Sequence, residues 1–151
     1  MQWLFPVAVT LHNGEEALFM PSWVSDHRGQ IRLHPSAAAI WVALLLLTAG
    51  AYAITALSAK RGRQSVWAYL LFGYVAAMLI NVFVPHVPAA MVFRTYAPGV
   101  ITAVLINLPV MSILLFQAVR DQWVTGAKAA VYAVLMPLAM GGSIVVLFTL
   151  A

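Results

Sequence analysis

Three ionisable side chains, His12, Glu15 and Glu16, lie inside an apolar segment that runs roughly from Trp3 to Met20. On a helix, the spacing of three and four residues puts all three side chains on one face. Ionisable groups within a lipid bilayer are costly, and they usually face the interior of a helix bundle and mark a functional site. An imidazole beside two carboxylates can transfer protons or bind a metal ion. This face is therefore the candidate functional site, with a purely structural polar network as the alternative.

The composition places these residues in a membrane protein. The chain has 151 residues, a length that fits one domain. It is 64% hydrophobic and 8% charged, whereas soluble domains carry about 25% charged residues. The net charge of +4 comes from scattered basic residues, a distribution that argues against a nucleic-acid partner. The absence of cysteine excludes disulfides, thiolate nucleophiles and cysteine metal sites.

The apolar runs predict an all-α fold, an integral membrane bundle of about five transmembrane helices in a single domain. The predicted helices cover residues 4–20, 36–59, 64–84, 99–119 and 129–150. Most of these runs have the length of about 20 residues that a membrane span needs. Pro21 is expected to end the first helix, and a polar loop to follow it. Ala89 to Tyr96 is expected to form a short interfacial helix or a re-entrant turn.

The basic residues predict how the bundle is oriented. With five spans, the loops on one side hold five basic residues: Lys60, Arg61, Arg63, Arg120 and Lys128. The loops on the other side hold three: Arg28, Arg32 and Arg94. Cytoplasmic loops carry an excess of Lys and Arg, so the first set is expected in the cytoplasm. The N-terminus would then lie inside the cell and the C-terminus outside.

Other polar residues are expected in the same half of the membrane as His12. From the helical rise, Asn107 lies roughly 13 Å and Asn81 roughly 7 Å below the same surface. We expect His86 to fold back over the first helix and complete the polar cluster, with Arg94 as a further candidate. Two alternatives stay open, because buried asparagines also join helices by hydrogen bonds and Arg94 can be a cation at the membrane surface.

These residues resemble a known family. The motif His12-x-x-Glu15-Glu16, near the start of a small polytopic protein, is similar to the motif that names the HXXEE-domain family. A second block also resembles the family's downstream pattern: Asn81, His86, Arg94, Tyr96, Pro98, Gly99, Thr102 and Pro109. The resemblance covers most of the chain and implies a bacterial membrane protein, so we expect the bacterial inner membrane. It implies no established activity.

Three classes of function fit the sequence. The first is an intramembrane enzyme of isomerase or cyclase type, in which His and Glu act as acid and base. The second is a metal-dependent membrane enzyme, because two histidines and a carboxylate suit Fe, Zn or Mn. The third is a small proton-coupled carrier or accessory membrane subunit, for which a homo-oligomer would supply the missing helices.

We favour an intramembrane enzyme that performs acid–base or metal-assisted chemistry on a lipidic or isoprenoid-like substrate. The expected partner is a membrane lipid or another hydrophobic small molecule. The candidate catalytic residues are His12, Glu15, Glu16, Asn81, His86, Arg94 and Asn107. The candidate ligands of a divalent metal are His12, Glu15, Glu16 and His86.

Overall fold

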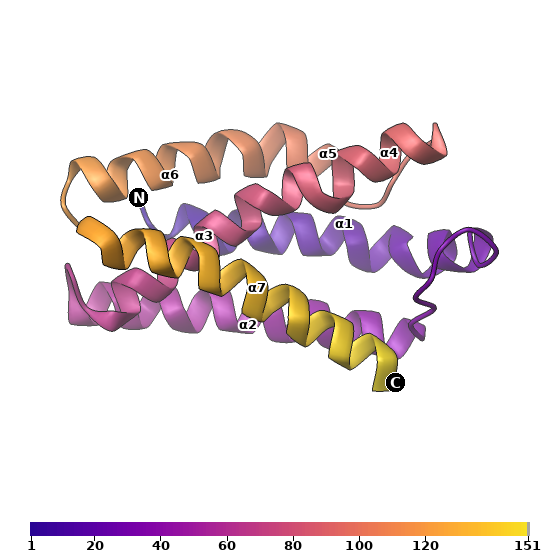
Figure 1. Cartoon of the computed structure of the whole chain (residues 1–151), viewed down its shortest axis with the longest axis horizontal. Coiled ribbons are helices and arrows are strands. Elements are labelled where there is room, and N and C mark those ends of the chain that lie inside the picture. Colours follow the sequence, from indigo (N-terminus) through magenta and orange to yellow (C-terminus); the bar gives the residue numbers. More distant parts are fainter. Residues whose placement is uncertain (151) are drawn as a thin grey trace.

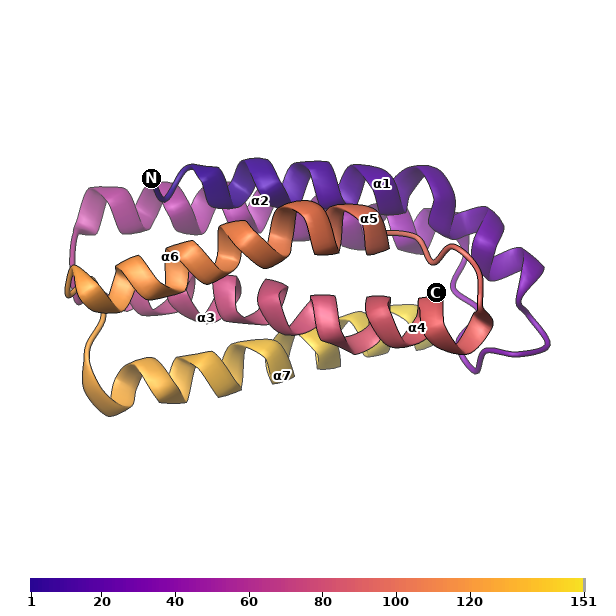
Figure 2. The ribbon, with the colours of Figure 1, turned by 90° about the horizontal axis from the view of Figure 1, so that it is seen from above.

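A computed structural model of the chain describes the backbone of residues 1–150 and the side chains of residues 1–149. As predicted, its regular structure is helical. The elements in chain order are α1 (Leu4–Asp26), α2 (Ala37–Arg61), α3 (Val66–Asn81), η1 (Val82–His86), α4 (Val87–Phe93), α5 (Val100–Thr102), η2 (Ala103–Asn107), α6 (Leu108–Arg120) and α7 (Gly126–Leu150). The element η2 is a single π-helical turn, whereas η1 is a kink in which Val84 leaves the helical conformation. They join α3 to α4 and α5 to α6, so five long helices lie side by side in one bundle (Figures 1 and 2).

Four helical stretches within the described residues are long and apolar enough to cross a membrane. They are Ala37–Arg61, Val66–Phe93, Val100–Arg120 and Gly126–Thr149. The remaining long helix, α1, has 23 residues, which is roughly 35 Å at the helical rise. It runs beside α2 along the bundle (Figure 2). The predicted fold class, an all-α bundle of about five long helices suited to a membrane, is confirmed.

The helix α1 does not end at Pro21, and the sequence-based prediction of its end was wrong. It continues to Asp26, so the following loop is shorter than expected. Pro21 has no N–H and cannot donate to the carbonyl of Ala17, four residues earlier. The indole N–H of Trp41 on α2 donates to that carbonyl at 3.1 Å. The hydrogen bond that proline removes is thus replaced from the neighbouring helix.

The segment after α3 is helical, with an irregular turn where His86 lies. Val84 leaves the helical region of backbone angles (φ −149°, ψ 109°) just before Pro85, and the chain resumes as α4. This turn leaves the His86 side chain buried, with 3% of its surface exposed. Of the two structures expected for residues 89–96, a short helix is therefore the one that forms, and it ends at Phe93.

Candidate functional site

The inward face of α1 carries His12 and Glu16, which are both buried. They are one helical turn apart, and His12 Nε2 lies 4.0 Å from Glu16 Oε2. The irregular turn η1 brings His86 to the same place, with its Nε2 3.5 Å from Glu16 Oε1. The two imidazole rings meet edge to face, with centroids 4.7 Å apart. Two nitrogens and a carboxylate oxygen, one from each residue, all lie within 4.8 Å of one another.

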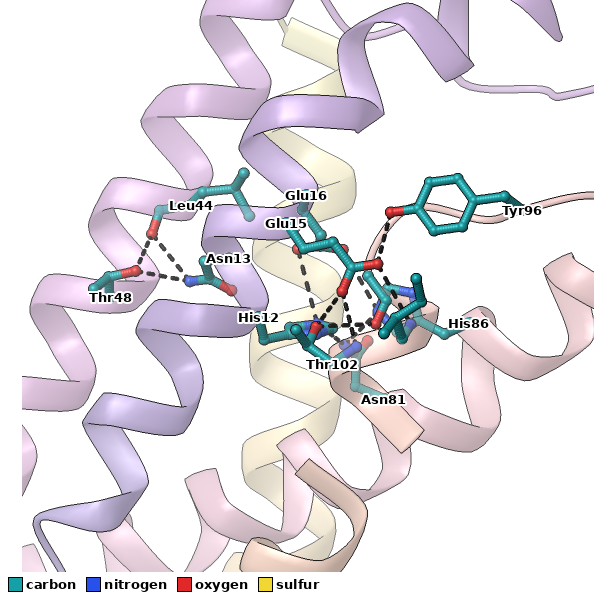
Figure 3. Close-up of polar contacts among 12 residues, drawn as sticks. His12, Asn13, Glu15, Glu16, Leu44, Thr48, Asn81, His86, Tyr96 and Thr102 are labelled. Atoms are coloured by element: carbon teal, nitrogen blue, oxygen red, sulfur yellow. Dashed lines mark hydrogen bonds and ion pairs between the residues drawn. The ribbon is translucent and has the colours of Figure 1, made fainter. Parts of the chain in front are cut away.

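Asn81, near the end of α3, lies between the two histidines (Figure 3). Its Nδ2 is 3.2 Å from His12 Nε2 and 2.9 Å from His86 Nε2. A side-chain amide nitrogen carries two hydrogens, so each hydrogen is donated to one histidine. Both Nε2 atoms then act as acceptors, which puts the proton of each neutral imidazole on Nδ1.

Thr102, at the end of α5, fixes the His12 ring from the other side. Its hydroxyl donates to Glu15 Oε2 at 2.6 Å, so its oxygen is left to accept from His12 Nδ1 at 3.0 Å. A histidine whose Nδ1–H is held in this way presents the lone pair of Nε2 in a fixed direction. The contacts with Thr102 and Asn81 therefore both place the proton of His12 on Nδ1.

Glu15 lies beside the histidines, and its carboxylate contacts Thr102 and Tyr96 (Figure 3). Besides the Thr102 hydroxyl, it accepts hydrogen bonds from the Thr102 amide at 2.8 Å and the Ile101 amide at 3.4 Å. The Tyr96 hydroxyl donates to it at 2.6 Å. Burial and then this hydrogen bond raise the pKa of the Tyr96 phenol above its ordinary value. Glu15 thus joins α1 to α5 through a fully used carboxylate.

Glu16 has the opposite surroundings. Within the part of the chain that is described, its carboxylate accepts no hydrogen bond, and its polar neighbours are the Nε2 atoms of His12 and His86. Both hydrogens of the Asn81 amide are used by those nitrogens. Buried polar groups are nearly always hydrogen-bonded. The two Nε2 lone pairs already accept from Asn81, so a cation that joins them to the Glu16 carboxylate takes the place of the Asn81 amide hydrogens.

The loop before α5 approaches this cluster so closely that only glycine fits at position 99. Gly99 has a φ of +86°, a conformation that side chains disfavour. A Cβ atom there would lie 2.6 Å from His86 Cε1, 2.9 Å from His12 Cε1 and 3.0 Å from Glu16 Cγ. Gly99 therefore forms one wall of the cluster, and any side chain at this position would displace the histidines.

The structure brings together five of the seven candidate residues. His12, Glu16, Asn81 and His86 form the cluster, and Glu15 lies beside it.

Arg94 does not join them: its side chain is exposed, and no ion pair links it to a carboxylate in the described residues. It ends α4 in the left-handed conformation (φ 50°), which ends the helix before its side chain reaches the bundle interior. Asn107 is fully buried, and neither polar atom of its side chain has a hydrogen-bond partner among the residues that the structure describes.

Sequence reasoning did not single out three residues that shape the site, namely Tyr96, Gly99 and Thr102. Each contacts α1 from a position more than 80 residues later in the chain. The one signal in the sequence is that all three belong to the second block, around Pro98.

Fold and site together define a class of protein: a helical bundle with long apolar helices and a buried His/Glu cluster. A family of proteins of unknown function with an HXXEE motif matches residues 3–114. Because the match covers well over half of the chain and includes the motif His12, Glu15 and Glu16, the chain belongs to this family.

One relative is the uncharacterized protein YrkK of Bacillus subtilis, which is 31% identical over 113 residues. The aligned part is 75% of this chain and 71% of the relative. No solved structure matches the chain. The family match includes the whole cluster and ends within α6, so α7 lies outside it.

Proposed function

We propose that this protein is an intramembrane, metal-dependent enzyme that acts on a lipidic or isoprenoid-like molecule. One observation carries the proposal: one ligand atom each of His12, His86 and Glu16 lies within 4.8 Å of the others, so a metal ion would bind all three in place of the Asn81 hydrogen bonds to the histidines. Two imidazoles and one carboxylate are a ligand set typical of Fe(II), and also suit Zn and Mn.

The residues around the three ligands support a metal site. A metal-binding histidine usually donates its other ring N–H to an oxygen, which fixes its orientation. Thr102 has this role for His12, and it is held in turn by Glu15. Glu15 was a candidate ligand, but four hydrogen bonds already hold its two oxygens, so we assign it to support. A divalent metal here would supply a Lewis acid that polarises a substrate oxygen.

A lipidic substrate follows from where the cluster lies. His12, His86 and Glu16 are buried in a bundle with four helices of membrane-spanning length and hydropathy. A molecule that reaches such a site from the bilayer needs an apolar body. Charged, water-soluble substrates would lose their hydration on entry without a basic side chain to compensate.

Acid–base catalysis without a metal is the second candidate, favoured by the 3.5 Å approach of Glu16 Oε1 to His86 Nε2. One proton between these atoms would also relieve the facing acceptors, and the pair would then act as donor and acceptor in an isomerisation or cyclisation. The two candidates differ in their response to a chelator, which would stop only the metal-dependent enzyme.

The metal content of the purified protein tests the proposal. We expect stoichiometric Fe, Zn or Mn in the wild-type protein, and a loss of this metal in His12→Ala and His86→Ala. The control is His34→Ala, because His34 lies in the exposed loop after α1 and bonds only the Arg28 carbonyl. A wild-type protein without metal after supplementation, or histidine variants that retain it, would contradict the proposal.

The orientation is a separate part of the proposal. We place the chain in the bacterial inner membrane with its N-terminus in the cytoplasm, because Lys60, Arg61 and Arg63 lie together at the end of α2. The chain has no cysteine, so labelling of a single introduced cysteine shows on which side of the membrane that position lies. In intact cells, a membrane-impermeant maleimide should label Gly29→Cys and not Lys60→Cys. The reverse pattern would invert the topology.

A further inference from the structure

A cavity of about 470 Å³ begins at the cluster and extends into the bundle between α1, α2, α3 and α7. This volume is within the range of roughly 300–1,000 Å³ of pockets for small molecules. Its walls are mostly apolar, with Leu44, Met78 and Ile144 among them. Glu16 and Asn81 line it, so the cavity reaches the candidate site itself.

The polar groups that the cavity leaves available to a ligand are hydrogen-bond acceptors. Three polar side chains line it, Asn13, Glu16 and Asn81. The Asn13 amide donates to the Leu44 carbonyl at 3.2 Å and to the Thr48 hydroxyl at 2.8 Å (Figure 3). The Asn81 amide donates to the two histidines. Both amide N–H groups are therefore used. Among the described residues that line the cavity, the acceptors that remain are the two amide oxygens and the Glu16 carboxylate, which is the strongest of them.

The cavity opens at an apolar part of the outer surface of the bundle. Three of its lining side chains are also exposed on the outside of the bundle: Ile80 at 47%, Val84 at 64% and Leu138 at 66%. They belong to the end of α3, to η1 and to α7. In a membrane this surface contacts lipid, so a ligand would enter from the bilayer and not from water.

We infer that this cavity binds an uncharged, single-chain lipid alcohol, with its hydroxyl group at Glu16 and its chain towards α7. The inference rests on the proposed function, because it takes the Glu16 end of the cavity as the place where the reaction occurs. The lining contains no lysine or arginine, which disfavours a phosphate or carboxylate head group. An acceptor-only group such as an ester would find no N–H or O–H donor there. A hydroxyl group supplies the donor that the Glu16 carboxylate requires.

Two adjacent glycines of α7 give a matched pair of variants. A Cβ atom at Gly141 or Gly142 would meet nothing within 4 Å, so a larger side chain causes no clash at either position. Gly141 lines the cavity and Gly142 does not. Gly141→Leu therefore extends a side chain beside the cavity, whereas Gly142→Leu adds the same atoms on another face of the helix. Leucine is a better helix former than glycine, so both variants should fold.

The experiment uses hexadecanol that carries a photoreactive diazirine in its chain, with the full-length protein in lipid vesicles. We expect crosslinks in Ala77–Pro85 or Pro137–Phe148 that unlabelled hexadecanol competes away. Labelling should fall by about tenfold in Gly141→Leu, because the cavity is filled, and stay unchanged in Gly142→Leu. The fatty acid with the same chain and diazirine should label far less than the alcohol.

Equal labelling of the two glycine variants, or equal labelling by the alcohol and the fatty acid, would overturn the inference. Metal analysis of the same samples separates it from the proposed function. Cavity-specific labelling of a protein that holds no metal would support the lipid alcohol and contradict the metal enzyme. If the wild-type protein holds metal but Gly141→Leu is labelled as strongly as the wild type, the metal enzyme would be supported and the lipid alcohol contradicted.

Discussion

Glu15 and Glu16 are neighbours in the sequence, but their carboxylates have opposite surroundings. Glu15 accepts four hydrogen bonds from the Tyr96 to Thr102 segment, and these bonds attach α1 to α5. Glu16 accepts none from the described residues and lies beside two imidazole nitrogens and an apolar cavity. A carboxylate with all its bonds made stabilises the fold, whereas one without donors is available to a ligand. The motif thus combines a structural and a reactive glutamate in adjacent positions.

The largest effect is expected from Glu16→Gln. It removes the anionic ligand, so the purified variant should contain little or no metal, measured by elemental analysis against Glu15→Gln as the control. Its thermal midpoint in detergent should fall to that of the metal-free wild-type protein, because a metal that binds only the folded state stabilises it. A Glu16→Gln protein that keeps its metal while Glu15→Gln loses it would exchange the two roles.

Gly99→Ala should be the next most damaging change, because it disturbs the surroundings of Glu16 and leaves those of Glu15 intact. The added methyl group clashes with both histidines and Glu16, in a backbone conformation that alanine disfavours. We expect a loss of about 1–3 kcal/mol in stability from the clash, together with weaker metal binding. Gly62→Ala is the control, because its φ of +79° is similar and its surroundings are open. Equal losses in the two variants would mean that the clash is relieved elsewhere.

Glu15→Gln should lower stability, and it should weaken metal binding far less than Glu16→Gln does, because its amide oxygen can still accept from Thr102. The new amide group turns a donor towards the hydroxyl and amide donors of the α5 segment. The expected cost is about 1–3 kcal/mol, the usual penalty for buried polar groups left without partners. Denaturant unfolding of the purified protein would measure it. If this variant is as stable as the wild type, the attachment of α1 to α5 must depend on other contacts.

The smallest effect is expected from Tyr96→Phe, which removes one of the four bonds to Glu15. Tyr96 is 37% exposed, so the loss should be under about 1 kcal/mol. The pKa of the Tyr96 phenol is raised in the folded protein. The stabilisation from its hydrogen bond to Glu15 is therefore fully present below the ordinary tyrosine pKa of about 10. It is lost as the pH rises through the pKa of Tyr96 in the folded protein. The stability difference between the two proteins should therefore be constant from neutral pH to about pH 9 and shrink above pH 10. A difference that changes near neutrality would point to another group.

The sequence was most informative where composition and local spacing determine the outcome. The low charge and the apolar runs predicted the helical bundle, and the spacing of His12 and Glu16 predicted their shared face. His86 was expected to fold back over the first helix, and its Nε2 does lie 3.5 Å from Glu16 Oε1.

The sequence failed where a distant residue decides the local structure. Trp41 replaces the hydrogen bond missing at Pro21, and no pattern within α1 indicates this. Arg94 was expected near the carboxylates because of its charge, but the backbone at the end of α4 leaves it exposed. The different roles of Glu15 and Glu16 also depend on donors from Thr102, and spacing alone treats the two residues alike.

The attachment of Glu15 to Thr102 also bears on how the protein is made. The two residues are separated by 87 positions, which at roughly 5–20 residues per second is a delay of several seconds during synthesis. Until α5 emerges from the ribosome, α1 carries two carboxylates and a histidine that nothing shields. It is also the long helix that falls short of the hydropathy of a membrane span. We therefore expect α1 to leave the translocon late, and to enter the bilayer only when the second half of the chain arrives.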